Sequence, residues 1–119
     1  MRGDRYLTKS VQYARVYEKG DSQVSSWLVM KAFPNGRYLS RYGFSVSRRV
    51  GKAVTRNRVK RLFREVLRLK SLVAGWDIIF IARPRIANAC YAEFDNEVSG
   101  LLARAHLLRD YERVSVTVD

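Results

Sequence analysis

The sequence is poor in the residues that build covalent or metal-dependent sites. It contains one cysteine, Cys90, and one histidine, His106, in 119 residues. A single thiol forms no intramolecular disulfide, which fits a reduced, intracellular setting, and we expect Cys90 to be a small buried apolar residue. A single histidine excludes a metal site built from several histidines.

Acidic residues are also scarce, and their spacing does not favour metal binding. The chain has 11 acidic residues, and none form a close, inward-facing pair on an expected strand. Nucleases that act alone usually gather carboxylates around metal ions. Gly51-Lys52 resembles part of a phosphate-binding loop, but the preceding glycine is too distant and Ala53 replaces the required Ser or Thr. We therefore expect the protein alone not to be a catalyst.

Long apolar runs and linker-like segments are absent as well. No run approaches the roughly 18 residues of a membrane-spanning helix, and the N-terminus lacks the apolar core of a signal peptide. The chain has no internal repeat and no Pro/Ser-rich linker. The sequence therefore predicts a single domain over residues 1–119 in the cytoplasm, with the tail after about residue 108 left unassigned.

Positive charge is what the chain has in excess, and most of it lies in one segment. Its 23 Lys and Arg residues and 11 acids give a net charge of +12. Residues 41–70 hold eleven cations and one acid, a net of +10, whereas the other 89 residues hold twelve cations and ten acids, a net of +2. A nearly neutral body with one strongly basic segment is typical of a protein that binds a phosphate backbone.

Residue periodicity predicts an α+β fold, a mixed sheet covered by helices. The expected elements are a helix from its N-cap Ser10 to Gly20, a hairpin of strands 27–33 and 38–47, a helix from about Lys52 or Thr55 to Leu69, a strand over 76–82 and a last helix over about 91–105. The strand over 76–82 is the most apolar and is expected to be central. The alternating residues 114–118 could form a short strand or a loose end.

The helix expected to end at Leu69 is amphipathic. A rotation of about 100° per residue places its apolar residues on one side, namely Val59, Leu62, Phe63, Val66 and Leu69. The opposite side holds Arg56, Asn57, Lys60, Arg61, Arg64 and Arg68, with Arg58 near the boundary. Glu65 is the only acid available among these cations, so a bound polyanion would relieve their repulsion. A basic helix can also bind membranes or calmodulin, but this one needs its apolar side for the core.

A second surface with aromatic and polar residues is expected outside this helix. Tyr13 and Tyr17 lie one helical turn apart. On the expected hairpin, Val29, Lys31 and Phe33 share one strand face, as do Ser45 and Ser47. Aromatic rings beside small polar side chains can stack with the bases of a single strand. The same tyrosines could instead cover the core, and their spacing does not decide between the two.

The basic segment also carries a specific sequence pattern. Residues 41–64 read RYGFSVSRRVGKAVTRNRVKRLFR, with Arg56-Asn57-Arg58 followed directly by Val59-Lys60-Arg61. This run closely resembles the protein subunit of bacterial ribonuclease P, and the resemblance extends over about residues 5–108. It implies a compact two-layer α/β sandwich with a mixed sheet of about four strands, three helices and a left-handed crossover around the basic helix, similar to domain 2 of ribosomal protein S5.

The resemblance implies that the protein works with RNA. The family partners a large catalytic RNA, which with Mg²⁺ hydrolyses one phosphodiester in precursor tRNA and removes the 5′ leader. The protein is expected to be a monomer bound to one RNA, and Mg²⁺ to be held mainly by that RNA. Two alternatives are a structured-RNA-binding protein of another kind, such as a ribosomal protein, and a DNA-binding module with the basic helix in a major groove.

Carried onto this sequence, the resemblance implies two sets of site residues. The face toward the catalytic RNA comprises Arg48, Arg49, Lys52, Arg56, Asn57, Arg58, Lys60, Arg61 and Arg64. The cleft for the single-stranded leader comprises Tyr13, Tyr17, Val29, Lys31, Ser45 and Ser47. The family often has Phe where this chain has the two tyrosines, and an aromatic residue can occur in place of Lys31, so the preferred leader sequence stays open.

Overall fold

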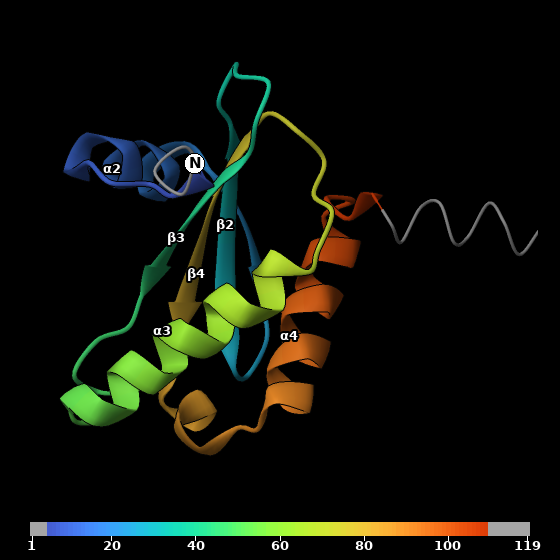
Figure 1. Cartoon of the computed structure of the whole chain (residues 1–119). Coiled ribbons are helices and arrows are strands. Elements are labelled where there is room, and N and C mark those ends of the chain that lie inside the picture. Colours follow the sequence, from blue (N-terminus) through green and yellow to red (C-terminus); the bar gives the residue numbers. More distant parts are fainter. Residues whose placement is uncertain (1–4, 110–119) are drawn as a thin grey trace, which may run out of the picture.

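The computed structural model describes residues 5–109 (Figure 1). In chain order, its elements are α2 (Ser10–Lys19), β1 (Asp21–Val24), β2 (Leu28–Pro34), β3 (Arg41–Ser45), α3 (Ala53–Arg68), β4 (Trp76–Ala82), the 3₁₀ helix η1 (Pro84–Asn88) and α4 (Tyr91–Arg104). The alternating residues 114–118 lie outside the described part of the chain.

The four strands form one mixed sheet in the order β1-β2-β4-β3. Strand β4 pairs antiparallel with β2 and parallel with β3, which confirms that the most apolar strand is central. The predicted hairpin of strands 27–33 and 38–47 is wrong, because β4 lies between its two halves. The antiparallel neighbour of β2 along the chain is instead β1, whose sequence DSQV is too polar to have been predicted as a strand.

The turn signal at Pro34-Asn35-Gly36 does start a loop, but this loop does not return the chain onto β2. The Asn35 N–H donates to Gly75 O over 2.8 Å, which fixes the loop to the start of β4. Strand β3 then runs beside β4, and α3 connects the two parallel strands. In Figure 1 the chain passes from β3 through α3, in front of the sheet, back to β4, and this crossover is left-handed. Most crossovers of this kind are right-handed.

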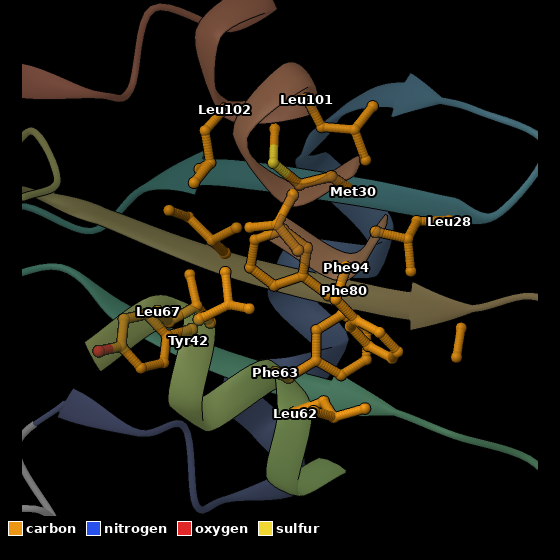
Figure 2. Packing of buried hydrophobic residues seen from close by; sticks show 14 of the residues in the cluster. Leu28, Met30, Tyr42, Leu62, Phe63, Leu67, Phe80, Phe94, Leu101 and Leu102 are labelled. Carbon is orange, nitrogen blue, oxygen red and sulfur yellow. The ribbon is translucent and has the colours of Figure 1, made fainter. Parts of the chain in front are cut away.

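Helices cover both faces of the sheet, and the larger core lies under α3 and α4. There the Phe63 ring is stacked 5.7 Å from Phe80 and meets Phe94 edge-on at 5.2 Å (Figure 2). On the opposite face, α2 places Val16 in a smaller cluster with Leu7 and Ile79. The apolar side predicted for the basic helix is confirmed at four positions, since Val59, Leu62, Phe63 and Val66 are buried.

Three predictions at the helix ends are wrong. Lys9, not Ser10, is the N-cap of α2. Leu69 lies beyond α3, where the helical phase no longer directs it to the core, so it is 67% exposed while Leu67 is buried. Cys90 is exposed rather than buried, because it is the N-cap of α4, where its N–H donates to Glu93 Oε1 over 2.9 Å.

A buried ion pair joins the beginnings of β3 and β4. Arg41 Nε and Nη2 donate to the two carboxylate oxygens of Asp77 over 2.9 and 2.8 Å, and the two side chains are 11% and 2% exposed. Asn35 Nδ2 also donates to Asp77, over 2.9 Å. At the other end of the basic segment, Lys70 forms an ion pair with Asp95. The two terminal cations of the segment are therefore paired within the fold.

Candidate nucleic-acid interface

The predicted RNA face lies along α3 and the turn that precedes it. Six of its side chains are exposed: Arg48, Arg49, Lys52, Asn57, Arg61 and Arg64. The other three, Arg56, Arg58 and Lys60, are half-buried. The positive end of the α3 helix dipole adds to the field of these cations. The first turn of α3 holds no acidic residue that would offset it. The surface is suited to phosphate groups.

Arg56 and Arg58 of this face also donate hydrogen bonds to backbone carbonyl groups within the protein. Arg58 Nη1 donates to Ala87 O over 3.1 Å, and Arg58 Nη2 donates to Ala89 O over 2.7 Å. Arg56 Nε donates to Gly51 O over 3.1 Å. An arginine has five N–H donors, so each guanidinium keeps donors for a phosphate. Arg58 therefore also fixes η1 against α3. The sequence placed Arg58 at the edge of the basic helix face and did not predict this structural role.

We predict that Arg58→Gln lowers the free energy of unfolding by about 2 kcal/mol, because hydrogen bonds from a charged donor contribute about 1.5–3 kcal/mol. Arg61→Gln is the matched control, since Arg61 is exposed and its Nε lies 4.0 Å from Glu65 Oε1. It should change stability by less than about 0.5 kcal/mol. Urea denaturation measures both values, and equal stability of the two variants would contradict the structural role of Arg58.

The predicted leader-cleft residues lie on the face of the sheet that α2 partly covers. The register aligns two rows of residues across the sheet, Val29–Ile81–Ser45 and Lys31–Ile79–Gly43. Helix α2 packs on the second row through Val16, which contacts Ile79. The first row is half-buried and supplies an apolar and polar floor beside the helix. Ser47 follows β3 and is exposed.

The two tyrosines differ in their surroundings. Tyr17 is 39% exposed and is available to stack with a base. Tyr13 is half-buried and packs against the cluster of Val16 and Ile79, so it also contributes to the core. Burial raises the pKa of Tyr13 above the usual range, with a backbone hydrogen bond to Phe44 acting in the opposite direction. Its hydroxyl therefore stays protonated and uncharged at neutral pH.

Sequence reasoning missed two residues of this surface, Gly43 and Ile81. A Cβ on Gly43 would lie 2.4 Å from Tyr13 Oη and 2.6 Å from Tyr13 Cζ, so only glycine lets the Tyr13 ring rest on β3. Ile81 occupies the middle of the floor, between Val29 and Ser45. The alternation of side chains along β4 predicts that Ile81 lies on one face of the sheet. Which residues lie beside it on that face depends on the strand order, which the sequence did not reveal.

Lys31, which departs from the family pattern, has a local structural partner. Its Nζ donates to Tyr17 O over 3.3 Å, in the last turn of α2. The last carbonyl groups of a helix lack intrahelical donors and carry partial negative charge, so a cation stabilises them. Lys31 therefore connects β2 to the end of α2.

Within residues 5–109, no three His, Cys, Asp or Glu side chains come together as metal ligands would. The described side chains therefore do not provide a metal centre built from three such ligands. Among the helices of the same residues, none has the length and apolar character needed to cross a membrane.

Comparison with known sequences finds one family across almost the whole chain. The model of the family described as Ribonuclease P matches residues 1–106. The ribonuclease P protein component of Dehalococcoides mccartyi is 46% identical over 108 residues, which are 91% of this chain and 90% of the relative. That of Caldanaerobacter subterraneus is 39% identical over 109 residues, covering 90% and 94% of the two chains.

Solved structures of the same family have this fold. A Staphylococcus aureus RNase P protein, a mutant with defective mRNA degradation activity, superposes with a TM-score of 0.84 at 30% identity, covering 90% of this chain and 92% of that one. The Thermotoga maritima RNase P protein gives a TM-score of 0.77 at 27% identity, covering 84% and 96%. These matches favour a subunit of the ribonuclease P endoribonuclease, partnered with its RNA, over a ribosomal protein. The chain belongs to the ribonuclease P protein family.

Proposed function

We propose that this chain aids the Mg²⁺-dependent removal of the 5′ leader from precursor tRNA by positioning RNA, while the catalytic RNA carries the chemistry. The observation that supports this most directly is that the two predicted sets of site residues lie on opposite faces of one sheet. The cations of α3 lie on one face, and the aromatic and polar residues predicted to bind the leader lie beside α2 on the other. We expect the protein to act in the cytoplasm as a monomer bound to one RNA.

The cationic face would act by electrostatics. Two RNA molecules that meet at an active centre repel each other through their phosphates, and exposed arginines placed between them reduce that repulsion. Arginine suits this role because its planar guanidinium forms paired hydrogen bonds with phosphate oxygens. Reduced repulsion would let the catalytic RNA fold and hold Mg²⁺ at a lower concentration of the ion.

The cleft would act by adding contacts that only the substrate can make. A leader strand lying along the row Val29–Ile81–Ser45 could stack one base on Tyr17, whose ring is accessible. Mature tRNA has no leader and cannot make these contacts. Binding energy from the cleft would therefore favour precursor over product and would help the product to leave.

Reconstitution with a ribonuclease P RNA at low Mg²⁺ tests the proposal. We expect the full chain to lower the Mg²⁺ concentration needed for leader removal, and the RNA-free protein to cleave nothing. An unchanged Mg²⁺ requirement would overturn the proposal, and so would cleavage by the protein without RNA. A DNA-binding module would instead prefer duplex DNA over structured RNA in a competition assay.

Gly43→Ala should specifically weaken binding of the precursor. The new Cβ displaces the Tyr13 ring, and because the clash involves the outer end of that side chain, the fold can accommodate it. Tyr13 is the second predicted stacking ring of the leader cleft beside Tyr17. Loss of one base-stacking contact corresponds to about tenfold weaker binding, and affinity for mature tRNA should not change.

Gly100→Ala in α4 is the matched control for this variant, because a Cβ there meets nothing within 4 Å. It should bind precursor and mature tRNA as the unmodified chain does. Equal losses for the two RNAs in Gly43→Ala would mean that Tyr13 supports the core rather than the leader cleft.

A further inference from the structure

A groove of about 980 Å³ runs along the outer edge of β3, between residues 5–8 on one side and the outer face of α3 on the other. This groove differs from both the predicted RNA face and the predicted leader cleft, although its lining includes residues of each. Its floor is formed by side chains of β3, and its far wall by the middle and end of α3. The groove therefore lies at the edge of the sheet, where the two faces of the molecule meet.

The near wall is held in place by the backbone of β3. Tyr6 bridges to Tyr42 in parallel fashion, and the Leu7 N–H donates to Tyr42 O over 3.0 Å. The Tyr6 ring meets Tyr42 edge-on at 5.2 Å, and the Tyr42 ring is stacked 6.3 Å from Phe44. Tyr42 is buried, but Tyr6 and Phe44 are half-buried. The groove thus presents two aromatic side chains in fixed positions.

The walls of the groove are strongly cationic. Its lining contains Arg5, Lys60, Arg61, Arg64 and Arg68, and one acid, Glu65. The Arg64 guanidinium lies 5.9 Å from the centre of the Phe44 ring, so charge and aromatic surface are adjacent. Cations that follow a backbone beside rings that accept bases are the two components of a site for single-stranded nucleic acid. In a duplex, the base faces are already stacked on one another.

The groove also joins the two surfaces described above. Tyr13 and Gly43 of the cleft lie at one side, and Lys60, Arg61 and Arg64 of the RNA face lie at the other. We infer that the groove binds an unpaired RNA strand, which passes around the edge of β3 from the cleft beside α2 to the cations of α3. This inference rests on the proposed RNA-binding function. The strand could come from the leader or from an unpaired segment of the catalytic RNA.

Binding of a labelled single-stranded RNA of about ten nucleotides to the isolated full chain tests the inference. The variant Arg64→Gln/Arg68→Gln should bind this RNA about tenfold more weakly at about 0.1 M salt, with a log–log salt slope smaller by about 1.4. Tyr6→Leu, which keeps apolar contact with the core, should weaken binding about fivefold without changing the slope. The control Arg15→Gln/Arg37→Gln removes the same charge from exposed sites away from the groove.

A matched RNA duplex separates groove binding from general attraction to phosphate. Equal losses for single strand and duplex in the Arg64→Gln/Arg68→Gln variant would overturn the inference, as would equal losses in the Arg15→Gln/Arg37→Gln control. The assay involves no cleavage, so its failure is distinct from failure of the reconstitution.

A series of precursors with increasing leader length identifies the source of the strand. If the leader occupies the groove, a holoenzyme carrying Tyr6→Leu, a residue outside the predicted RNA face, binds long-leader precursors more weakly and short-leader precursors normally. If the catalytic RNA occupies it, the same variant weakens assembly with that RNA whatever the leader. Normal binding in both assays would exclude an RNA strand from the groove in the holoenzyme and would overturn the inference.

Discussion

Replacing Arg48, Arg49 and Lys52 together by Gln should weaken binding to ribonuclease P RNA by about 10²–10³-fold at about 0.1 M salt, because each lost phosphate contact removes about 0.9 from the log–log salt slope. These three cations are exposed in the turn before α3 and at its N-cap, and they do not line the groove beside β3. The slope itself should fall by two to three, as measured by filter binding across a series of salt concentrations.

The matched control is a triple variant of Arg15, Lys19 and Arg37, which are exposed and lie outside the predicted RNA face. Both triple variants reduce the net charge from +12 to +9, since each removes three positive charges. The control should keep most of its affinity and its salt slope. If the two variants lose affinity equally, total charge rather than the α3 face determines RNA binding.

Arg41→Ala should lower the free energy of unfolding by about 3–5 kcal/mol, the usual cost of removing one partner of a buried ion pair. The Asp77 carboxylate is 2% exposed and would keep Asn35 Nδ2 as its side-chain donor. An unpaired charge in that position is poorly solvated, and the start of β3 would lose its fixed place beside β4. Urea denaturation with linear extrapolation gives the change.

The double variant Arg41→Ala/Asp77→Ala separates the charge from the packing. Removing both partners leaves no buried charge, so it should recover a large part of the stability lost in Arg41→Ala. Arg37→Ala, in the exposed part of the same loop, is the control and should be close to neutral. A loss in Arg41→Ala no larger than that of Arg37→Ala would contradict a structural role for the ion pair.

The elements with strong local signals were predictable from the sequence. The apolar run of Trp76–Ala82 predicted β4 with its observed bounds, and the helical spacing from Val59 to Val66 predicted the buried side of α3. In both segments, each residue's environment is set by its neighbours in the chain. At the end of a helix, the spacing of apolar residues no longer determines which of them are buried. Leu69 was therefore predicted to lie in the core, but it is exposed.

The partners of each strand could not be predicted in this way. A turn signal at Asn35-Gly36 predicts a reversal, but the hydrogen bond from Asn35 to Gly75 is made by residues that are far apart in sequence. The candidate site also contains residues that could not be predicted, because they are brought together by contacts between distant segments. Charge and family resemblance indicated most of its residues, whereas Gly43 and Ile81 become part of it only through the register of β4 with its two neighbours.

The insertion of β4 between β2 and β3 has a consequence for the order in which the protein can fold. Strand β4 is the last of the four along the chain, yet it provides the pairing partner of β3 and one of the two partners of β2. During synthesis, the hairpin of β1 and β2 can form early. The four-stranded sheet cannot form until residues 76–82 have been synthesised. Pairing between distant segments is also slow. A nascent chain that ends before Trp76 would carry the cations of α3 without the strand that positions them, so its attraction to RNA would be strong but unselective.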